Sequence, residues 1–339
     1  MTSTNLTRRA VTLGAAAVAT LGVGRARAQT GPITIKFSHV VAADAPKGKA
    51  ADRFKELAEK YTQGRVKVEV YHNSTLYKDK EELEALQLGA VQMLAPSNAK
   101  FGPLGVKEFE VLDLPLLVPS LKALRNVTEG PIGKAMLAKL QTVGIVGLDY
   151  WDNGFKVMTA NRELRRVADF EGLKMRIQSS KVLQAQFRAL GALPQVLAFS
   201  EVYQALQTGV CDGQENTPTN VVTQKMHEVQ KHMTVSNHGY IGYILVMGKP
   251  FWDGLPADIR PPLEKAIAEC TAFVNELAEK ENAEAIATVK ASGKTAVITL
   301  TPAEAEEWRK AMFPVYEEMG PRVGKQLLTD IQKAVGTTG

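Results

Sequence analysis

The N-terminal part of the chain alternates strand and helix patterns. Apolar and polar residues alternate over 33–37 and again over 66–70, which is the period of a strand. Between them, residues 46–61 place apolar side chains at intervals of three and four, and residues 79–89 form a second helical stretch that closes at a glycine. This alternation predicts an α/β lobe with a mostly parallel sheet.

Two later segments predict that the chain passes between two lobes. Residues 143–150 form an apolar strand that leads into a first crossing, and residues 237–247 form an apolar strand on which the chain returns. We therefore expect one lobe from residues 29–152 plus about 240–280, and a second lobe from residues 153–239 plus about 281–335.

One long amphipathic helix is predicted from Asp258 to about Ser292. The apolar positions that set its pattern are Leu263, Ile267, Cys270, Val274, Leu277 and Ile286. Such a length suits a helix that runs across the backs of both lobes. Further on, Thr301 followed three residues later by Glu304 predicts a capping box at the start of the last helix.

The first 28 residues have the pattern of an export signal. Arg8 and Arg9 precede an apolar run from Ala10 to Val23, and Ala26 to Ala28 form a plausible cleavage site. The apolar run is too short for a permanent transmembrane helix. We expect a periplasmic protein that is cut after about Ala28. The paired arginines favour twin-arginine export, and general secretion stays open as the alternative.

The charge of the chain after this segment argues against nucleic-acid binding. Four of the 41 Lys and Arg residues lie in residues 1–28, which leaves 37 basic residues against 36 acidic ones. Nucleic-acid-binding proteins need a basic excess on one face. About 310 residues are enough for two α/β lobes with their own cores.

Arg176 is the candidate centre of a binding site. Residues 173–178 alternate in the strand period, which places Arg176 near a strand end, just before a helix that Ser179 and Ser180 can cap. A guanidinium on rigid backbone suits bidentate capture of a carboxylate. Two interpretations follow from residue type alone. Arg176 pairs with Glu215, or it binds an anionic ligand together with Asn216.

Catalytic and metal-binding patterns do not emerge from the sequence. We find no nucleophile elbow, dinucleotide fingerprint or phosphate loop, and the five histidines lack metal-ligand spacing. We therefore expect no catalytic residues, no metal and no cofactor. Cys211 and Cys270 either form a disulfide or remain buried thiols, and we expect the thiols.

Several long motifs are similar to those of one known family. They are GLKMRIQSS at 172–180, AFSEVYQALQTG at 198–209, CDGQENTP at 211–218, YWDNGFKVMTANR at 150–162 and FWDGLPADIR at 251–260. These runs resemble the solute-binding proteins of TRAP transporters, the DctP-like family, over nearly all of the chain after the export signal. The resemblance implies a two-lobed periplasmic-binding-protein fold of the α/β class, type II-like, with a long helix spanning both lobes.

The resemblance also implies a binding site. In the family, an arginine at the position of Arg176 forms a salt bridge with the substrate carboxylate, and an asparagine at the position of Asn216 assists it. Lys156 stands where sialic-acid-binding relatives carry a second arginine, and a lysine offers no two-pronged fork. The run DNGFK, together with HVVAADAPKGKAA, resembles instead the members that bind C4-dicarboxylates.

A dicarboxylate needs a second cation away from Arg176. Four lysines are candidates, each with a solvated surface charge as the alternative: Lys47, Lys78, Lys100 and Lys156. The other expected contacts are polar groups of His39, Ser97, Asn98, Asn153 and Ser179, and apolar walls from Trp151, Phe199 and Tyr240.

The sequence thus predicts a periplasmic substrate-binding protein of an ATP-independent TRAP transporter. Its cargo would be a small organic acid, above all a C4-dicarboxylate such as succinate, malate or fumarate. Its partners would be the small and large membrane permease subunits, without an ATPase and without nucleic acid. The alternatives are a sugar acid, 2-oxo acid or aromatic acid as cargo, a periplasmic enzyme that acts on an organic acid, and a binding module that serves a sensor.

Overall fold

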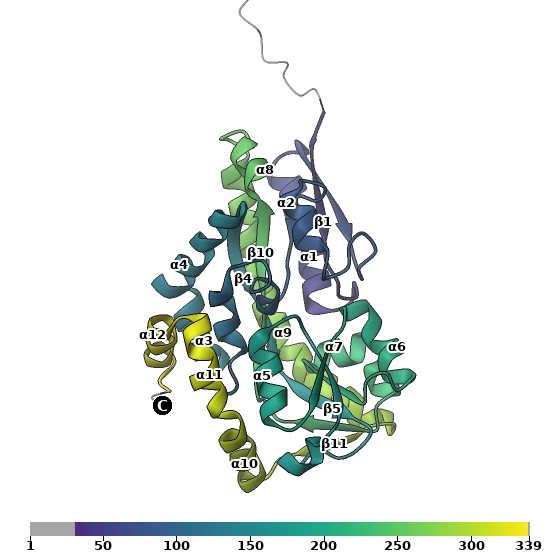
Figure 1. The fold of residues 1–339 in the computed structure, drawn as a ribbon. Coiled ribbons are helices and arrows are strands. Elements are labelled where there is room, and N and C mark those ends of the chain that lie inside the picture. The colour runs from purple at the N-terminus through teal and green to yellow at the C-terminus, as the bar shows by residue number, and fades with distance from the viewer. Residues whose placement is uncertain (1–30, 338–339) are drawn as a thin grey trace, which may run out of the picture.

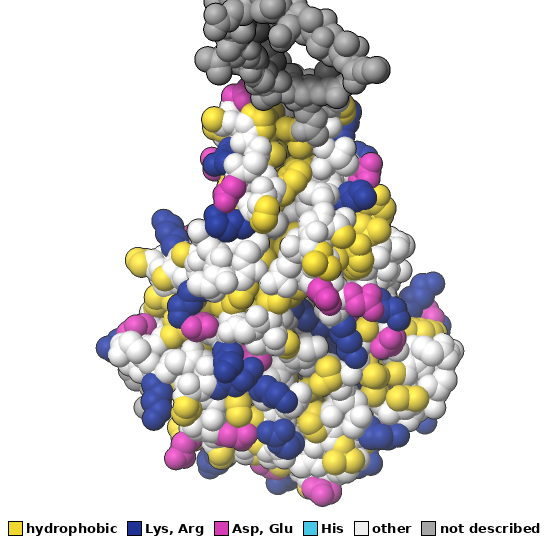
Figure 2. All heavy atoms as spheres, turned by 45° about the horizontal axis from the view of Figure 1, so that its top comes forward, with side chains coloured by type: hydrophobic (Ala, Val, Ile, Leu, Met, Phe, Trp, Pro, Cys, Tyr) yellow, Lys and Arg dark blue, Asp and Glu magenta, His cyan; other side chains and the backbone are white. Residues whose placement is uncertain are grey.

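The computed structural model describes residues 31–337, which form two lobes joined side by side (Figure 1). The predicted export signal, residues 1–28, lies outside the described residues. Among the helices of residues 31–337, none combines the length and hydrophobicity that crossing a membrane requires. On the face shown in Figure 2, basic and acidic side chains are interspersed, in keeping with the balanced charge of this part of the chain.

The first lobe is built on a five-stranded sheet with the order β2-β1-β3-β10-β4. Its strands are β1 (Ile33–Ser38), β2 (Val66–Tyr71), β3 (Met93–Leu94), β4 (Ile145–Phe155) and β10 (Tyr240–Gly248). Its helices are α1 (Pro46–Tyr61), α2 (Glu82–Gln87), α3 (Leu121–Thr128), α4 (Pro131–Lys139) and α8 (Lys249–Gly254). β1 is parallel to β2 and β3, and Ile35 and Phe37 point into the core as the period-two pattern predicts.

The second lobe is built on a six-stranded sheet with the order β11-β9-β5-β8-β6-β7. Its strands are β5 (Val157–Ala160), β6 (Lys174–Ile177), β7 (Leu193–Val196), β8 (Gly213–Asn216), β9 (His232–Val235) and β11 (Ala296–Thr299). Its helices include α5 (Lys181–Ala189), α6 (Val202–Gln207), α7 (Pro218–Thr223) and α10 (Pro302–Met312).

The sheet of the first lobe is mostly parallel, as predicted, and so is that of the second lobe, with one strand in each that runs against the others. β10 returns from the second lobe and runs antiparallel to β3 and β4, while β5 runs antiparallel to β8 and β9. The antiparallel strands are the ones that carry the chain between lobes. A chain that leaves and re-enters a sheet in this way reverses direction relative to the βαβ units already there.

The long helix α9 (Arg260–Ser292) confirms the prediction and joins the two lobes. It packs against α1 and β4 of the first lobe and against α7 and β11 of the second. Its 33 residues extend over about 50 Å. The helix ends at Gly293, whose φ of +65° is a left-handed conformation that favours glycine. Cys270 on its buried face and Cys211 are both free thiols.

The C-terminal helices divide between the lobes. α11 (Pro314–Val323) packs against α5, whereas α12 (Lys325–Val335) packs against α3 and α4 of the first lobe (Figure 1). We therefore propose that residues 325–335 belong with the first lobe, although the sequence pattern placed them in the second.

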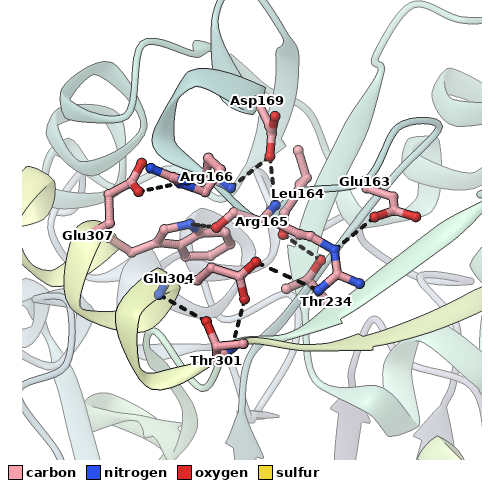
Figure 3. Close-up of polar contacts among 10 residues, drawn as sticks. Glu163, Leu164, Arg165, Arg166, Asp169, Thr234, Thr301, Glu304 and Glu307 are labelled. Carbon is pink, nitrogen blue, oxygen red and sulfur yellow. Dashed lines mark hydrogen bonds and ion pairs between the residues drawn. The ribbon is translucent and has the colours of Figure 1, made fainter.

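A polar cluster anchors α10 to the loop before β6 (Figure 3). At the start of α10, the Thr301 amide donates to Glu304 Oε2 at 2.7 Å and the Glu304 amide donates to Thr301 Oγ1 at 3.3 Å, so the predicted capping box is present. Trp308 Nε1 donates to the Arg165 carbonyl at 2.8 Å. Asp169 Oδ2 accepts the amides of Arg165 at 2.8 Å and Arg166 at 2.7 Å, which fixes the turn that α10 covers.

We expect Asp169→Ala to lower the free energy of unfolding by about 1–3 kcal/mol, because two backbone amides lose their acceptor. Urea denaturation measures this change. The matched control is Glu163→Ala in the same loop, whose exposed carboxylate binds only the side chain of Arg165. Such a surface pair contributes about 1 kcal/mol or less. Equal effects of the two substitutions would contradict the role given to Asp169.

Candidate ligand-binding site

A cavity that is partly open to solvent lies between the lobes at the ends of the strands. Its empty space, including the part that opens to solvent, is about 360 Å³. The first lobe contributes Val40, Val41, Lys47, Asp79, Glu82, Ser97, Lys100, Ile241 and Tyr243, and the second contributes Arg176, Gln178, Phe199, Asn216 and Asn220. Several of these residues directly follow β1, β6 and β8, and ligands of α/β sheets bind beyond the carboxyl ends of the strands.

Arg176 on β6 is buried, with 1% of its surface exposed, and faces this cavity. Its Nε and Nη2 donate to the carbonyl of Leu197 at 3.2 and 2.9 Å, which fixes one edge of the guanidinium. Its Nη1 has no hydrogen-bond partner within residues 31–337. The ring of Phe199 lies 5.8 Å from the guanidinium carbon. The backbone therefore holds the Nε and Nη2 edge of the planar guanidinium, and Nη1 can donate to a ligand.

The alternative pairing of Arg176 with Glu215 is not the arrangement that the structure shows. Glu215 Oε2 lies 2.6 Å from Lys156 Nζ and 3.4 Å from His238 Nε2. The acid nearest to Arg176 is Asp79, 4.0 Å from Nη2. Burial lowers the pKa of Arg176, and the two acids Asp79 and Glu215 oppose that shift.

Asn216 lies at the end of β8 and lines the same cavity. Its Oδ1 accepts hydrogen bonds from the amide of Thr217 at 3.0 Å and from Asn220 Nδ2 at 2.8 Å. Because the oxygen is occupied, the amide NH₂ is the group that Asn216 can offer to a ligand oxygen.

Lys47 and Glu82 bring opposite charges into the cavity from the first lobe. Lys47 Nζ donates to the carbonyl of Ala95 at 2.9 Å and lies 3.6 Å from the centre of the Tyr243 ring. Both side chains are buried. Burial lowers the pKa of Lys47 and raises the pKa of Glu82, because each charged form loses water that its neighbours replace only in part.

Asp79 links the two lobes across the cavity. Its Oδ2 lies 2.6 Å from Lys100 Nζ in the first lobe, and its Oδ1 accepts the amide of Phe199 in the second lobe at 3.2 Å. Burial opposes the charge of Asp79, yet the attraction of Lys100 and Arg176 lowers its pKa below the usual range. Asp79 is therefore an ionised acid that holds two cations beside the cavity.

Further contacts show that the lobes are closed over the cavity. Lys78 Nζ lies 3.1 Å from Glu201 Oε1, and Lys80 Nζ donates to the carbonyl of Val196 at 3.4 Å. The Gln224 amide donates to Asn73 at 3.1 Å. All three contacts join residues 73–80 of the first lobe to the second lobe.

Lys156 lies outside the cavity, so the expectation that it could hold a second carboxylate is revised. It is fully buried where the chain passes from β4 to β5, and its charge is paired with Glu215. Burial opposes the charge of Glu215, but Lys156 and His238 lower its pKa to about 2. This cluster connects both crossing segments to β8.

Lys78 and His39 also have partners other than a ligand. The exposed Lys78 pairs with Glu201 on the surface. His39 Nε2 lies 2.9 Å from His72 Nδ1, and burial lowers the pKa of His39 well below its usual value, which keeps the ring neutral. His39 precedes the cavity residues Val40 and Val41 and does not itself line the cavity.

The expected aromatic walls are only partly correct. Phe199 lines the cavity. Trp151 lies in the core and donates from Nε1 to Thr271 at 3.0 Å, and the Tyr240 hydroxyl donates to Asp152 at 2.6 Å. Neither of the two lines the cavity.

Among the expected polar contacts, only Ser97 lines the cavity, where its hydroxyl donates to Gln178. Asn98 Nδ2 donates to Asp113 Oδ1 at 2.8 Å, and Asn153 Oδ1 accepts the hydroxyl of Thr217 at 3.1 Å. Ser179 is half-buried and outside the lining. Asn98 and Asn153 therefore serve the fold around the site.

Sequence reasoning missed five polar residues of the lining: Asp79, Glu82, Gln178, Asn220 and Tyr243. Two of them carried a usable signal. Gln178 follows Arg176 by two residues and so shares its face of the strand, and Asn220 follows Asn216 by four, one turn into α7. Asp79 and Glu82 belong to the first lobe, whereas Arg176 belongs to the second. No local sequence pattern therefore indicates that these residues line the same cavity.

Two α/β lobes closed around a polar cavity, with crossing strands and a shared long helix, define a solute-binding protein. The family model DctP, bacterial extracellular solute-binding protein, family 7, matches residues 37–322. The chain belongs to this family, which confirms the expected fold and the expected class of a solute-binding protein.

Individual relatives agree with this membership. The chain is 62% identical over 303 residues to the C4-dicarboxylate-binding periplasmic protein DctP of Rhodobacter capsulatus, covering 89% of this chain and 91% of that protein. It is similar to a TRAP periplasmic solute-binding protein of Shewanella oneidensis with bound succinate (TM-score 0.88, 43% identity, 90% of this chain and 100% of that chain). It is also similar to one of Pseudomonas aeruginosa with bound L-malate (TM-score 0.82, 44% identity, 85% and 100%).

We expect Lys156→Met to lower the free energy of unfolding by about 3–5 kcal/mol at pH 7, because it leaves Glu215 as an uncompensated buried charge. The loss should shrink as pH falls through the usual pKa of glutamate. Glu215 stabilises the folded protein above that pKa and loses this effect as pH falls towards 2. Chemical denaturation at pH 7 and pH 4 measures both effects. Lys78→Met, which breaks an exposed pair, is the control and should have little effect.

Proposed function

We propose that the protein captures a C4-dicarboxylate such as succinate, malate or fumarate in the periplasm. The observation that carries this proposal is one cavity between the lobes that is lined by Lys47, Lys100 and Arg176, whose Nη1 has no hydrogen-bond partner among residues 31–337. A monocarboxylate would leave part of this positive charge without a partner. The succinate and L-malate bound by the structural relatives support the same substrate class.

In this proposal the two carboxylates have separate partners. Arg176 and Asn216 of the second lobe bind one carboxylate, as the family resemblance implies. Lys47 of the first lobe, rather than Lys156, binds the other, with Lys100 close by and already paired with Asp79. A ligand that bridges the lobes in this way stabilises their closed arrangement.

The energetics fit reversible capture. A hydrogen bond to a charged group contributes roughly 1.5–3 kcal/mol. A handful of such bonds, together with two ion pairs in the cleft, are of the order of the ~8 kcal/mol of micromolar affinity. Release then requires that the lobes open, which we assign to contact with the small and large permease subunits. Export by the N-terminal signal, cut after about Ala28, places the protein in the compartment where its ligand arrives.

We expect Arg176→Ala to weaken succinate binding about 100-fold or more, because the fixed guanidinium is lost. Arg176→Lys should recover only part of the affinity, since a lysine cannot bind Leu197 and a carboxylate in the same fork geometry. Isothermal titration calorimetry measures both. Arg188→Ala, which removes an exposed arginine that pairs with Glu318, is the control and should bind as wild type. Near-normal affinity in Arg176→Ala would refute the site.

We expect Lys47→Met to weaken the binding of succinate more than that of its monoamide, succinamate, because only succinate carries the second charge. The comparison of the two dissociation constants in each variant isolates this effect from general damage to the cavity. Lys49→Met, at an exposed position of the same helix, is the matched control. Equal losses for both ligands would show that Lys47 does not bind the second carboxylate.

A thermal-shift screen of the wild type then ranks cargoes. A ligand raises the melting temperature according to its concentration relative to its dissociation constant. Dicarboxylates should stabilise the protein more than sugar acids, 2-oxo acids or aromatic acids at equal concentration. A larger shift with one of these other acids would replace the dicarboxylate as the cargo and leave the class of protein intact.

A further inference from the structure

Glu82 is the group in the cavity that the proposed function does not explain. It lies at the start of α2, is 1% exposed and lines a cavity that is proposed to bind an anion. Asp79, the other acid of the lining, is paired with Lys100 at 2.6 Å, whereas no ion pair within residues 31–337 includes Glu82. A buried, unpaired carboxylate beside an anionic ligand would repel that ligand.

The charges in the cavity show how this conflict is resolved. With a dicarboxylate bound, Lys47, Lys100 and Arg176 supply the positive charge of the cavity, and Asp79 is held ionised by Lys100 and Arg176. With a dicarboxylate dianion, these four residues come to zero net charge if Glu82 is neutral. If Glu82 were ionised, the closed site would carry one uncompensated negative charge in a region from which water is largely excluded.

We propose that Glu82 is protonated in the complex and donates its O–H as a hydrogen bond to the ligand, so that a dicarboxylate dianion binds together with one proton. This inference rests on the proposed function and adds a specificity-determining residue to it. Glu82 then recognises a carboxylate or hydroxyl oxygen as a neutral donor, and Lys47 supplies the positive charge on the same side of the cavity.

The groups around Glu82 favour this state. Those that face it are Lys47 on α1, Asp79 before α2, Lys100 in the 3-10 turn Asn98–Lys100 and Tyr243 on β10. Burial and Asp79 raise the pKa of Glu82, Lys47 and Lys100 oppose them, and the result is a pKa of about 7. A bound dianion adds negative charge and raises this pKa again.

The direction of the pH dependence follows from this. Above about pH 7 the free protein has lost the Glu82 proton and must take one up on binding, so affinity falls as pH rises through 7 and above. Lys47, whose pKa burial lowers to about 7, could supply the same proton. Glu82→Gln alone does not separate the two groups, because it removes the negative charge that raises the pKa of Lys47 and leaves Lys47 to take up a proton on binding. Lys47→Arg keeps a positive charge that does not titrate, so in that background Glu82→Gln tests Glu82 alone.

The experiment is calorimetry of succinate binding at pH 6.5 to 8.5 in phosphate and in Tris, two buffers with different heats of ionisation. For the wild type we expect proton uptake to rise towards one per succinate with increasing pH, and affinity to fall by up to about tenfold per pH unit above 7. Lys47→Arg should keep this uptake, and the double variant Lys47→Arg/Glu82→Gln should show almost no uptake, little pH dependence, and tighter binding than Lys47→Arg at pH 8.5. Glu81→Gln, at the exposed neighbouring position, should behave as wild type.

Four results would overturn the inference. Wild type that binds succinate without proton uptake contradicts it alone and leaves the proposed function standing. Uptake that persists when Glu82→Gln is added to Lys47→Arg assigns the proton to another group. Binding that Glu82→Gln weakens at every pH in the same background shows that the ionised carboxylate is the useful form. Failure of the wild type to bind any dicarboxylate would overturn the proposed function and this inference with it.

Discussion

The rest of the structure depends on the guanidinium of Arg176, which is held out of water with one edge unbound. The carbonyl of Leu197 fixes the orientation of the group, and Asp79 at 4.0 Å neutralises only part of its charge. A buried cation without a full set of partners destabilises the closed state, so an anion that completes the set stabilises it. Closure of the lobes and capture of an acid are therefore the same event, and Asp79, bonded to both lobes, connects them.

The fold serves this interaction by keeping its own charges away from the ligand. Where β4 passes into β5 and β9 into β10, the crossing segments carry Lys156 and His238, and both face Glu215 on β8. Asn216, the next residue of β8, points to the cavity instead, because successive side chains of a strand alternate between its faces. The short strand β8 thus contributes Glu215 to a buried ion pair of the fold and Asn216 to the lining of the cavity.

Features that depend on neighbouring residues could be predicted from the sequence, whereas contacts between residues distant in sequence could not. The strand period around residues 173–178 placed Arg176 correctly on β6, and Asn216, singled out by its motif, lines the same cavity. Lys47 was one of four candidate lysines, and no local pattern distinguished it from Lys156 or Lys78, because their partners Glu215 and Glu201 are distant in sequence. Glu82 had no signal at all. It reaches the cavity from a six-residue helix of the first lobe, and a buried acid in an anion site contradicts simple charge complementarity.

Asp79 and Glu82 show why residue type alone cannot assign a charge in such a cavity. Both are buried acids three residues apart, and both line the same cavity as Lys47, Lys100 and Arg176. Asp79 lies 2.6 Å from Lys100, and its pKa is lowered, whereas Glu82 forms no such contact within the described residues and its pKa is raised. Pairs of acids whose surroundings separate their pKa values have different tasks. Here one acid remains an anion that fixes the cations, and the other becomes a neutral donor when a second anion, the ligand, takes the remaining positive charge.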